Sequence, residues 1–316
     1  MSYDNPQPMR DQLDDAIKAA LMTHTLDSSL EEYEIDVPMS DGWKHKATVV
    51  RRKTCSQSES TPTTNSNRPL IVLFHGGGFC AGSANLLIRP ARDFAKAFDA
   101  VVVSCTYRLS PEHKFPLHFD DAMDTVKWLA NHTQDSEIGA HTEAGFIIGG
   151  QSAGASLAAT VLQHMQESEM GLRATGGYIC IPLLLTDAIL PPQYKDIWTS
   201  RDENCNKLPL LSAEGVAKMV AAMGAEVQSP KFSPFSAARP HRDLPRIYVQ
   251  VGKLDPLRDD GLVYERALRD SGVETRLECY DDIGHDTWSI FSNEQSPKDF
   301  AKNSLAAMEW LLKRDE

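Results

Sequence analysis

The sequence predicts an α/β protein with a mostly parallel sheet and helices on both of its faces. Short apolar stretches of β type alternate with longer stretches of helical periodicity through most of the 316 residues. Some strands are continuously apolar, such as Val101-Val102-Val103, as strands buried on both faces usually are. Two apolar strands, ending near Phe74 and Ile148, break abruptly into glycine-rich turns. These three observations favour a doubly wound arrangement.

The elements follow from the pattern in chain order. An amphipathic helix opens the chain at about 9–21, and a strand pair at 31–37 and 43–51 turns at 40–42. Residues 54–67 are rich in Ser, Thr and Asn, which predicts an exposed flexible loop. Further strands are expected at 70–74, 100–104, 145–149, 175–181, 246–252 and 275–280, and helices at 86–98, 120–130, after Ser152, at 256–270 and from Pro297 to Lys313.

One region breaks this alternation. Residues 187–230, between two strands, are too many for a simple connection and contain an apolar helix around Val216 and Met223. We interpret them as an inserted helical cap that, with the first helix, covers the carboxyl ends of the strands, where such folds bind ligands. A decorative insertion with an ordinary core helix is the alternative. The expected organisation is an N-terminal cap helix region (1–30), a first part of the α/β core (31–186), the inserted cap (187–230) and a second part of the core (231–316).

Composition and charge narrow the possible functions. The net charge of −12 argues against binding to nucleic acid or to an anionic membrane surface. We see no apolar stretch long enough to span a membrane and no apolar signal-peptide region. The six cysteines are scattered without a C-x-x-C pair, which is typical of reduced thiols and favours a cytoplasmic protein. A homodimer is left open.

Two motifs indicate acyl-transfer chemistry. After strand 70–74, the segment His75-Gly76-Gly77-Gly78 can turn its backbone N–H groups toward one point, as an oxyanion hole requires. Gly150-Gln151-Ser152-Ala153-Gly154 fits G-x-S-x-G, a sharp strand-to-helix turn that exposes a serine. An ordinary tight turn and a helix-capping serine are the alternatives for each motif alone. Their joint occurrence, each after an apolar strand, favours a serine hydrolase.

A catalytic serine needs a histidine and an acid. In doubly wound hydrolases the acid and then the histidine follow the serine in the chain. Asp255 comes directly after strand 246–252, although it could also be a helix N-cap. Asp259 and Asp260 are weaker candidates because they lie further into the next helix. The histidines that follow the serine are His164, inside a helix, His241, before a strand, and His285, which follows the last strand and is the best-placed base.

These motifs resemble the hormone-sensitive-lipase-like carboxylesterases of the α/β-hydrolase superfamily, from about residue 70 to the C-terminus. The resemblance implies an α/β-hydrolase fold, Ser152 as nucleophile, His285 as base and Asp255 as its orienting acid. It also implies an oxyanion hole from Gly77, Gly78 and Ala153, with Gly76 shaping the loop. The matching stretches are 75–79, Tyr107–Pro116, 150–154, Asp255–Asp259 and Ser233-Pro234-Phe235.

Several positions depart from the family pattern. Gln151 stands where the family commonly has Asp, and Ala155 where it has Gly. Asp286 follows the histidine where the family often has Gly, which leaves the pocket shape open. His113, His118, Asp120 and Asp121 do not have zinc-ligand spacing, so no metal is expected. The candidate substrate pocket consists of Phe79, Tyr194, Trp198, Met219, Met223 and Trp288.

The sequence thus predicts a serine esterase that acts on small to medium apolar esters through an acyl-enzyme and without a cofactor. A lactonase, an amidase or a biosynthetic deacylase acting on one metabolite is the main alternative. A ligand receptor on an inactive esterase scaffold is a third hypothesis. It is disfavoured because such receptors lose the catalytic histidine, whereas His285 is present here.

Overall fold

The computed structural model describes residues 3, 5–23, 25–53, 67–168, 171–205, 211–285 and 299–313. The predicted loop at 54–67 lies outside these ranges except for its last residue, as do the candidate pocket residue Trp288, Asp286 and the start of the predicted helix from Pro297.

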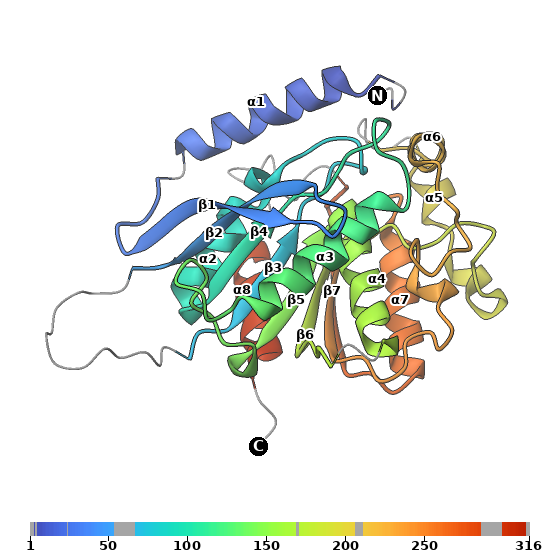
Figure 1. The fold of residues 1–316 in the computed structure, drawn as a ribbon. Coiled ribbons are helices and arrows are strands. Elements are labelled where there is room, and N and C mark those ends of the chain that lie inside the picture. The colour runs from blue at the N-terminus through green and yellow to red at the C-terminus, as the bar shows by residue number, and fades with distance from the viewer. Residues whose placement is uncertain are drawn as a thin grey trace, which may run out of the picture.

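A mostly parallel sheet forms the centre of the molecule, as predicted (Figure 1). Its strand order is β1-β2-β4-β3-β5-β6-β7-β8. The β1–β2 and β2–β4 pairs are antiparallel, and the other neighbours are parallel. The strands are β1 (Leu30–Pro38), β2 (Lys44–Arg52), β3 (Leu70–Phe74), β4 (Val101–Cys105), β5 (Phe146–Gln151), β6 (Gly176–Cys180), β7 (Arg246–Gly252) and β8 (Thr275–Tyr280).

Helices cover both faces of the sheet. Successive side chains of a strand point to opposite faces, so a continuously apolar strand makes both faces apolar, and both must be buried. In β3, Leu70 and Val72 join the apolar core beneath α3, α4 and α7, while Ile71 joins the core beneath α2 and α8. Figure 1 shows the two layers of helices on either side of the strands. The helices are α2 (Ile88–Phe98), α3 (Leu117–Asn131), α4 (Ala153–Glu167), α7 (Arg258–Asp270) and α8 (Phe300–Leu312).

Two further regions lie outside this core. Helix α1 (Gln7–Thr23) packs through Leu13 and Ile17 on Ala81 and Leu86, directly after the glycine-rich segment. The long connection between β6 and β7 contains short helices, where the sequence predicted an inserted cap. They are η3 (Pro192–Ile197), α5 (Ser200–Glu203), α6 (Ala213–Met223) and η4 (Pro234–Ser236). The division into core and cap remains a prediction.

The glycines of the G-x-S-x-G motif are required by close packing. A Cβ atom on Gly154 would lie 2.5 Å from the carbonyl oxygen of His75, far inside van der Waals distance.

This packing predicts the effect of a substitution on stability. Because the added methyl group would clash with the backbone, we expect Gly154→Ala to lower the free energy of unfolding by about 1–3 kcal/mol or more. Gly215→Ala, in helix α6, is the matched control because its Cβ would meet Ser212 Oγ at 3.4 Å and Leu211 Cδ1 at 3.9 Å, both ordinary contacts. It should leave stability unchanged or raise it by up to about 1 kcal/mol. Equal denaturant midpoints for Gly154→Ala and wild type would contradict this packing.

Candidate active site

The candidate nucleophile occupies a strained turn between β5 and α4. Ser152 has φ 53° and ψ −122°, a conformation that costs a residue with a side chain of order 1–3 kcal/mol. Its N–H donates to the carbonyl oxygen of Cys180 on β6 at 2.8 Å. A Cβ on Gly150 would lie 2.6 Å from the carbonyl oxygen of Phe74, so the turn fits against β3 only without side chains on either side. The G-x-S-x-G spacing is therefore a packing requirement.

Ser152, His285 and Asp255 form a continuous chain of hydrogen bonds. Ser152 Oγ lies 2.8 Å from His285 Nε2, and His285 Nδ1 lies 2.9 Å from Asp255 Oδ2. Because a carboxylate oxygen accepts, Nδ1 is the donor to Asp255, and Nε2 is the ring nitrogen that faces the serine hydroxyl. Asp255 is fully buried, and its Oδ1 accepts the N–H of Leu257 at 2.7 Å. The structure thus brings together the three residues that the sequence selected.

The other acids near Asp255 have different partners. Asp260 Oδ2 accepts the N–H groups of Leu184 and Leu185 at 2.8 and 2.9 Å. Asp259 Oδ2 accepts the N–H groups of Thr199 and Ser200 at 2.7 and 2.6 Å. Both carboxylates hold the segment after β6 and the helical insertion.

The two other candidate histidines lie apart from this chain of hydrogen bonds. His164, on α4, packs edge-on against Phe119. His241 is buried between Phe235 and Tyr264, and burial lowers its pKa to about 4. Its ring is therefore neutral near pH 7, in an aromatic environment.

The glycine-rich loop lies directly against the nucleophile turn. A Cβ on Gly76 would be 3.2 Å from Ser152 Cβ, so the loop passes beside the serine. Gly77 and Gly78 have φ 114° and 61°, which glycine adopts readily. Within the described ranges, the N–H groups of Gly77, Gly78 and Ala153 donate to no protein acceptor. Free donors beside the nucleophile are what an oxyanion hole needs.

His75 supports this loop and is neutral. Its Nδ1 lies 2.6 Å from the carbonyl oxygen of Gly76, its Nε2 2.9 Å from Thr106 Oγ1, and its ring stacks on Tyr107. Complete burial lowers its pKa to about 4. Since the carbonyl of Gly76 can only accept, Nδ1 carries the single proton and Nε2 accepts from the threonine hydroxyl. His75 thus fixes the carbonyl of Gly76.

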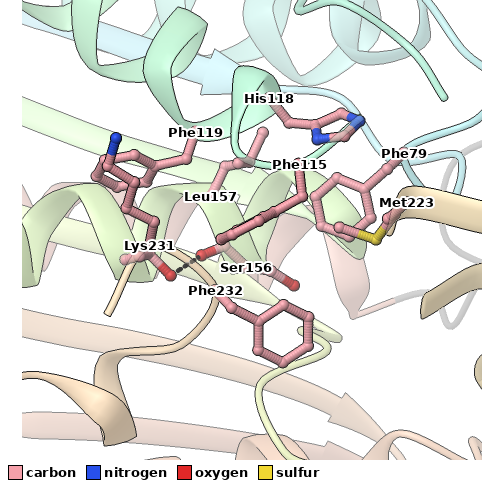
Figure 2. A pocket seen from close by; sticks show the side chains of 10 residues that line it. Phe79, Phe115, His118, Phe119, Ser156, Leu157, Met223, Lys231 and Phe232 are labelled. Atoms are coloured by element: carbon pink, nitrogen blue, oxygen red, sulfur yellow. Dashed lines mark hydrogen bonds between the residues drawn. The ribbon is translucent and has the colours of Figure 1, made fainter. Parts of the chain in front are cut away.

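Two of the six candidate pocket residues line a small pocket of mixed apolar and polar side chains beside α4 (Figure 2). Phe79 and Met223 face Phe115, Leu157 and Phe232 there. The space between the lining side chains is about 10 Å³, room for about one water molecule. A ligand group could enter only if side chains moved, and Met223 is unbranched and flexible.

The other candidate pocket residues have different surroundings. Met219 packs on the glycine-rich loop. A Cβ atom added to Gly78 would lie only 2.8 Å from Met219 Sδ. Trp198 Nε1 donates to the buried Asp260 at 2.9 Å. Tyr194 OH donates to Asp270, at the end of α7 furthest from Asp255. These contacts favour an anchoring role for Trp198 and Tyr194, and their place in a pocket remains a prediction.

Sequence reasoning missed several residues that contact the site's loops. Arg10 on α1 donates to the carbonyl oxygens of Cys80 and Ser110 at 2.7 and 3.0 Å, and to both oxygens of Glu112. Asn204 of the insertion donates to two carbonyls next to Asp255. In the sequence, the α1 region stands out only by the helical spacing of its apolar residues, and no motif points to Asn204.

The candidates set aside for metal binding have other roles. Asp121 accepts hydrogen bonds from Arg108 and from His45 Nε2, and His118 Nε2 lies 2.9 Å from Ser110 Oγ. These contacts brace the Tyr107–Pro116 segment. In the part of the chain that the structure describes, no three His, Cys, Asp or Glu residues gather as metal ligands, and no helix is both long and apolar enough to cross a membrane.

Comparisons with known proteins agree with this architecture. AB hydrolase superfamily protein B1A11.02 of Schizosaccharomyces pombe is 30% identical over 252 residues, which is 78% of this chain and 71% of that protein. Esterase LipI of Mycobacterium tuberculosis is 33% identical over 66% of this chain, which spans 62% of LipI. The crystal structure of an esterase from Pyrobaculum calidifontis superposes with a TM-score of 0.81 at 25% identity, covering 97% of this chain and 93% of that one.

The family model described as "alpha/beta hydrolase fold" matches residues 71–289, which is more than half of the chain and includes the glycine-rich loop, the nucleophile turn, Asp255 and His285. The chain therefore belongs to the hormone-sensitive-lipase-like carboxylesterases of the α/β-hydrolase superfamily.

Proposed function

We propose that this protein is a serine carboxylesterase that hydrolyses small to medium apolar esters through an acyl-enzyme. The observation that carries the proposal is the hydrogen-bonded chain from Ser152 through His285 to Asp255, beside three backbone N–H groups that donate to no acceptor among the described residues. An isolated serine is a weak nucleophile, and a neighbouring base oriented by an acid is the usual way to activate it.

The proposed reaction has two halves. Ser152 Oγ attacks the ester carbonyl while its proton moves to His285 Nε2, and Asp255 stabilises the imidazolium. The N–H groups of Gly77, Gly78 and Ala153 stabilise the oxyanion, and the alcohol leaves with the proton from Nε2. Water then gives a proton to the same histidine and attacks the acyl-serine, and His285 returns this proton to Ser152 Oγ as the acid leaves.

The surroundings of the serine support a small acyl group. The pocket beside α4 is nearly filled and has a largely aromatic and aliphatic lining, of which Met223 is a flexible member. The same chemistry would hydrolyse a lactone or an amide. Which of these bonds is the natural one depends on which leaving group fits the site.

The role of the serine predicts a complete loss of function on its removal. Ser152→Ala should lower kcat/KM toward a short p-nitrophenyl ester by at least ~10³-fold, because only the oxyanion donors and binding remain. Ser168→Ala, beyond the far end of the same helix, is the control and should keep wild-type kinetics. Both variants should unfold at about the wild-type Tm or above, since each substitution removes only a hydroxyl group. Near-normal turnover by Ser152→Ala would eliminate the serine mechanism.

The acid assignment predicts different defects for neighbouring carboxylates. Asp255→Asn should lower kcat by about 10⁴-fold, because an amide hydrogen can force the wrong tautomer on His285. Asp259→Asn should chiefly lower the Tm, because its carboxylate binds backbone N–H groups of the insertion and not the histidine. The comparison is kcat and Tm for both variants. A silent Asp255→Asn beside an inactive Asp259→Asn would reverse the assignment.

The pocket predicts which residue limits acyl length. Met223→Ala should move the preferred p-nitrophenyl ester toward longer acyl chains, with each accommodated methylene contributing about 1–3 kcal/mol to specificity. Tyr194→Phe is the control, because the tyrosine hydroxyl bonds to Asp270 at the far end of α7. kcat/KM across a chain-length series, with lactones and amides alongside, measures the effect. An unchanged length profile in Met223→Ala would show that this pocket does not hold the acyl chain, and a preference for a lactone or an amide would replace the ester proposal.

A further inference from the structure

The helical insertion contacts the turn that carries the proposed acid. Asn204, directly after α5, is fully buried, and its Nδ2 lies 3.1 Å from the carbonyl oxygen of Lys253 and 3.0 Å from that of Asp255. Because both partners are carbonyls, the NH₂ group and not the amide oxygen must face them. One side-chain amide thus holds the two peptide carbonyls on either side of Leu254.

A second set of bonds joins the same two segments. Ser200 Oγ donates to the carbonyl oxygen of Pro256 at 2.9 Å and accepts the N–H of Asp259 at 3.1 Å. Asp259 in return accepts the N–H groups of Thr199 and Ser200. The contact therefore runs in both directions, and the first turn of α7 is locked to the insertion.

The carboxylate of Asp255 depends on the position of this turn. Its backbone N–H donates to Gly252 at 3.1 Å, its Oδ1 accepts the N–H of Leu257 at 2.7 Å, and its Oδ2 faces His285 at 2.9 Å. The turn fixes the carboxylate through its own backbone, so a shift of the turn shifts Oδ2 away from the imidazole. A displacement of about 1 Å in a catalytic arrangement can cost 10²-fold in rate.

We propose that Asn204 is a positioning residue of the inserted cap, which aligns Asp255 with His285 by holding the carbonyls of Lys253 and Asp255. This rests on the proposed Ser152–His285–Asp255 mechanism. The hydrogen bonds of Asn204 go to these two carbonyls and not to the serine or the histidine, so it acts on the chemical step through the acid. The insertion is then part of the arrangement that orients the base.

Kinetics of Asn204→Leu test the inference, because leucine has a similar volume but no donor. We expect kcat toward a short p-nitrophenyl ester to fall about 10–100-fold while KM changes less than about twofold. Asn204→Ser, which keeps one donor, is the milder variant if the leucine protein folds poorly, and its loss should be smaller. Ser233→Ala is the matched control, since Ser233 is equally buried and its Oγ donates to the carbonyl oxygen of Leu184 and not to a carbonyl of the acid turn. It should keep wild-type kcat.

A double-mutant cycle separates positioning from a general structural role. In an Asp255→Asn background the Asn204 substitution should cost less than about twofold in kcat, because the group that it positions is already lost. An equal fold loss in both backgrounds, or a wild-type kcat in Asn204→Leu, would overturn the inference. If Asp255→Asn alone were silent, the proposed mechanism itself would fail. An inactive Asp255→Asn beside a fully active Asn204→Leu would contradict only the role of Asn204.

Discussion

The strained turn at Ser152 is the constraint on which the rest of the site depends. A residue with a side chain is held at positive φ between a buried strand and a buried helix, and this requires that the backbone of β3 approach closely. Gly150 and Gly154 permit that approach, and the same proximity places the glycine-rich loop after β3 beside the serine. The turn at Ser152 and the glycine-rich loop are therefore one packing unit. The core on both faces of the sheet supplies the stability that maintains this strain.

Parallel strands explain how residues far apart in the sequence converge on this turn. β3, β5, β7 and β8 all run in one direction, so the segments that follow them emerge at one edge of the sheet. The loop after β7 carries Asp255 and the loop after β8 carries His285, on neighbouring strands. The insertion after β6 then reaches the acid turn through Ser200 and Asn204. The insertion therefore contacts the loop that carries the proposed acid.

Sequence reasoning was most successful where a residue is dictated by local backbone geometry. The strands and the two glycine motifs follow from periodicity and turn chemistry. The known order of serine, acid and histidine in doubly wound hydrolases then selected the three side chains, which the structure places in hydrogen-bond contact. It was least informative about side chains whose partners are distant in sequence. Trp198 looks like a pocket aromatic in the sequence, yet its indole N–H bonds to Asp260, and Asn204 has no local pattern at all. Such partners are determined by tertiary contacts, and the periodicity of the sequence carries no information about them.

The measurement that tests the central claim most directly is the location of a covalent adduct. After reaction with a small serine-directed phosphonate, intact mass should show one adduct per chain, and peptide mapping should place it on Ser152. A crystal structure of the adduct should show the phosphonyl oxygen within about 2.7–3.1 Å of the N–H groups of Gly77, Gly78 and Ala153. An adduct on another residue, or a phosphonyl oxygen that points away from this loop, would contradict the account.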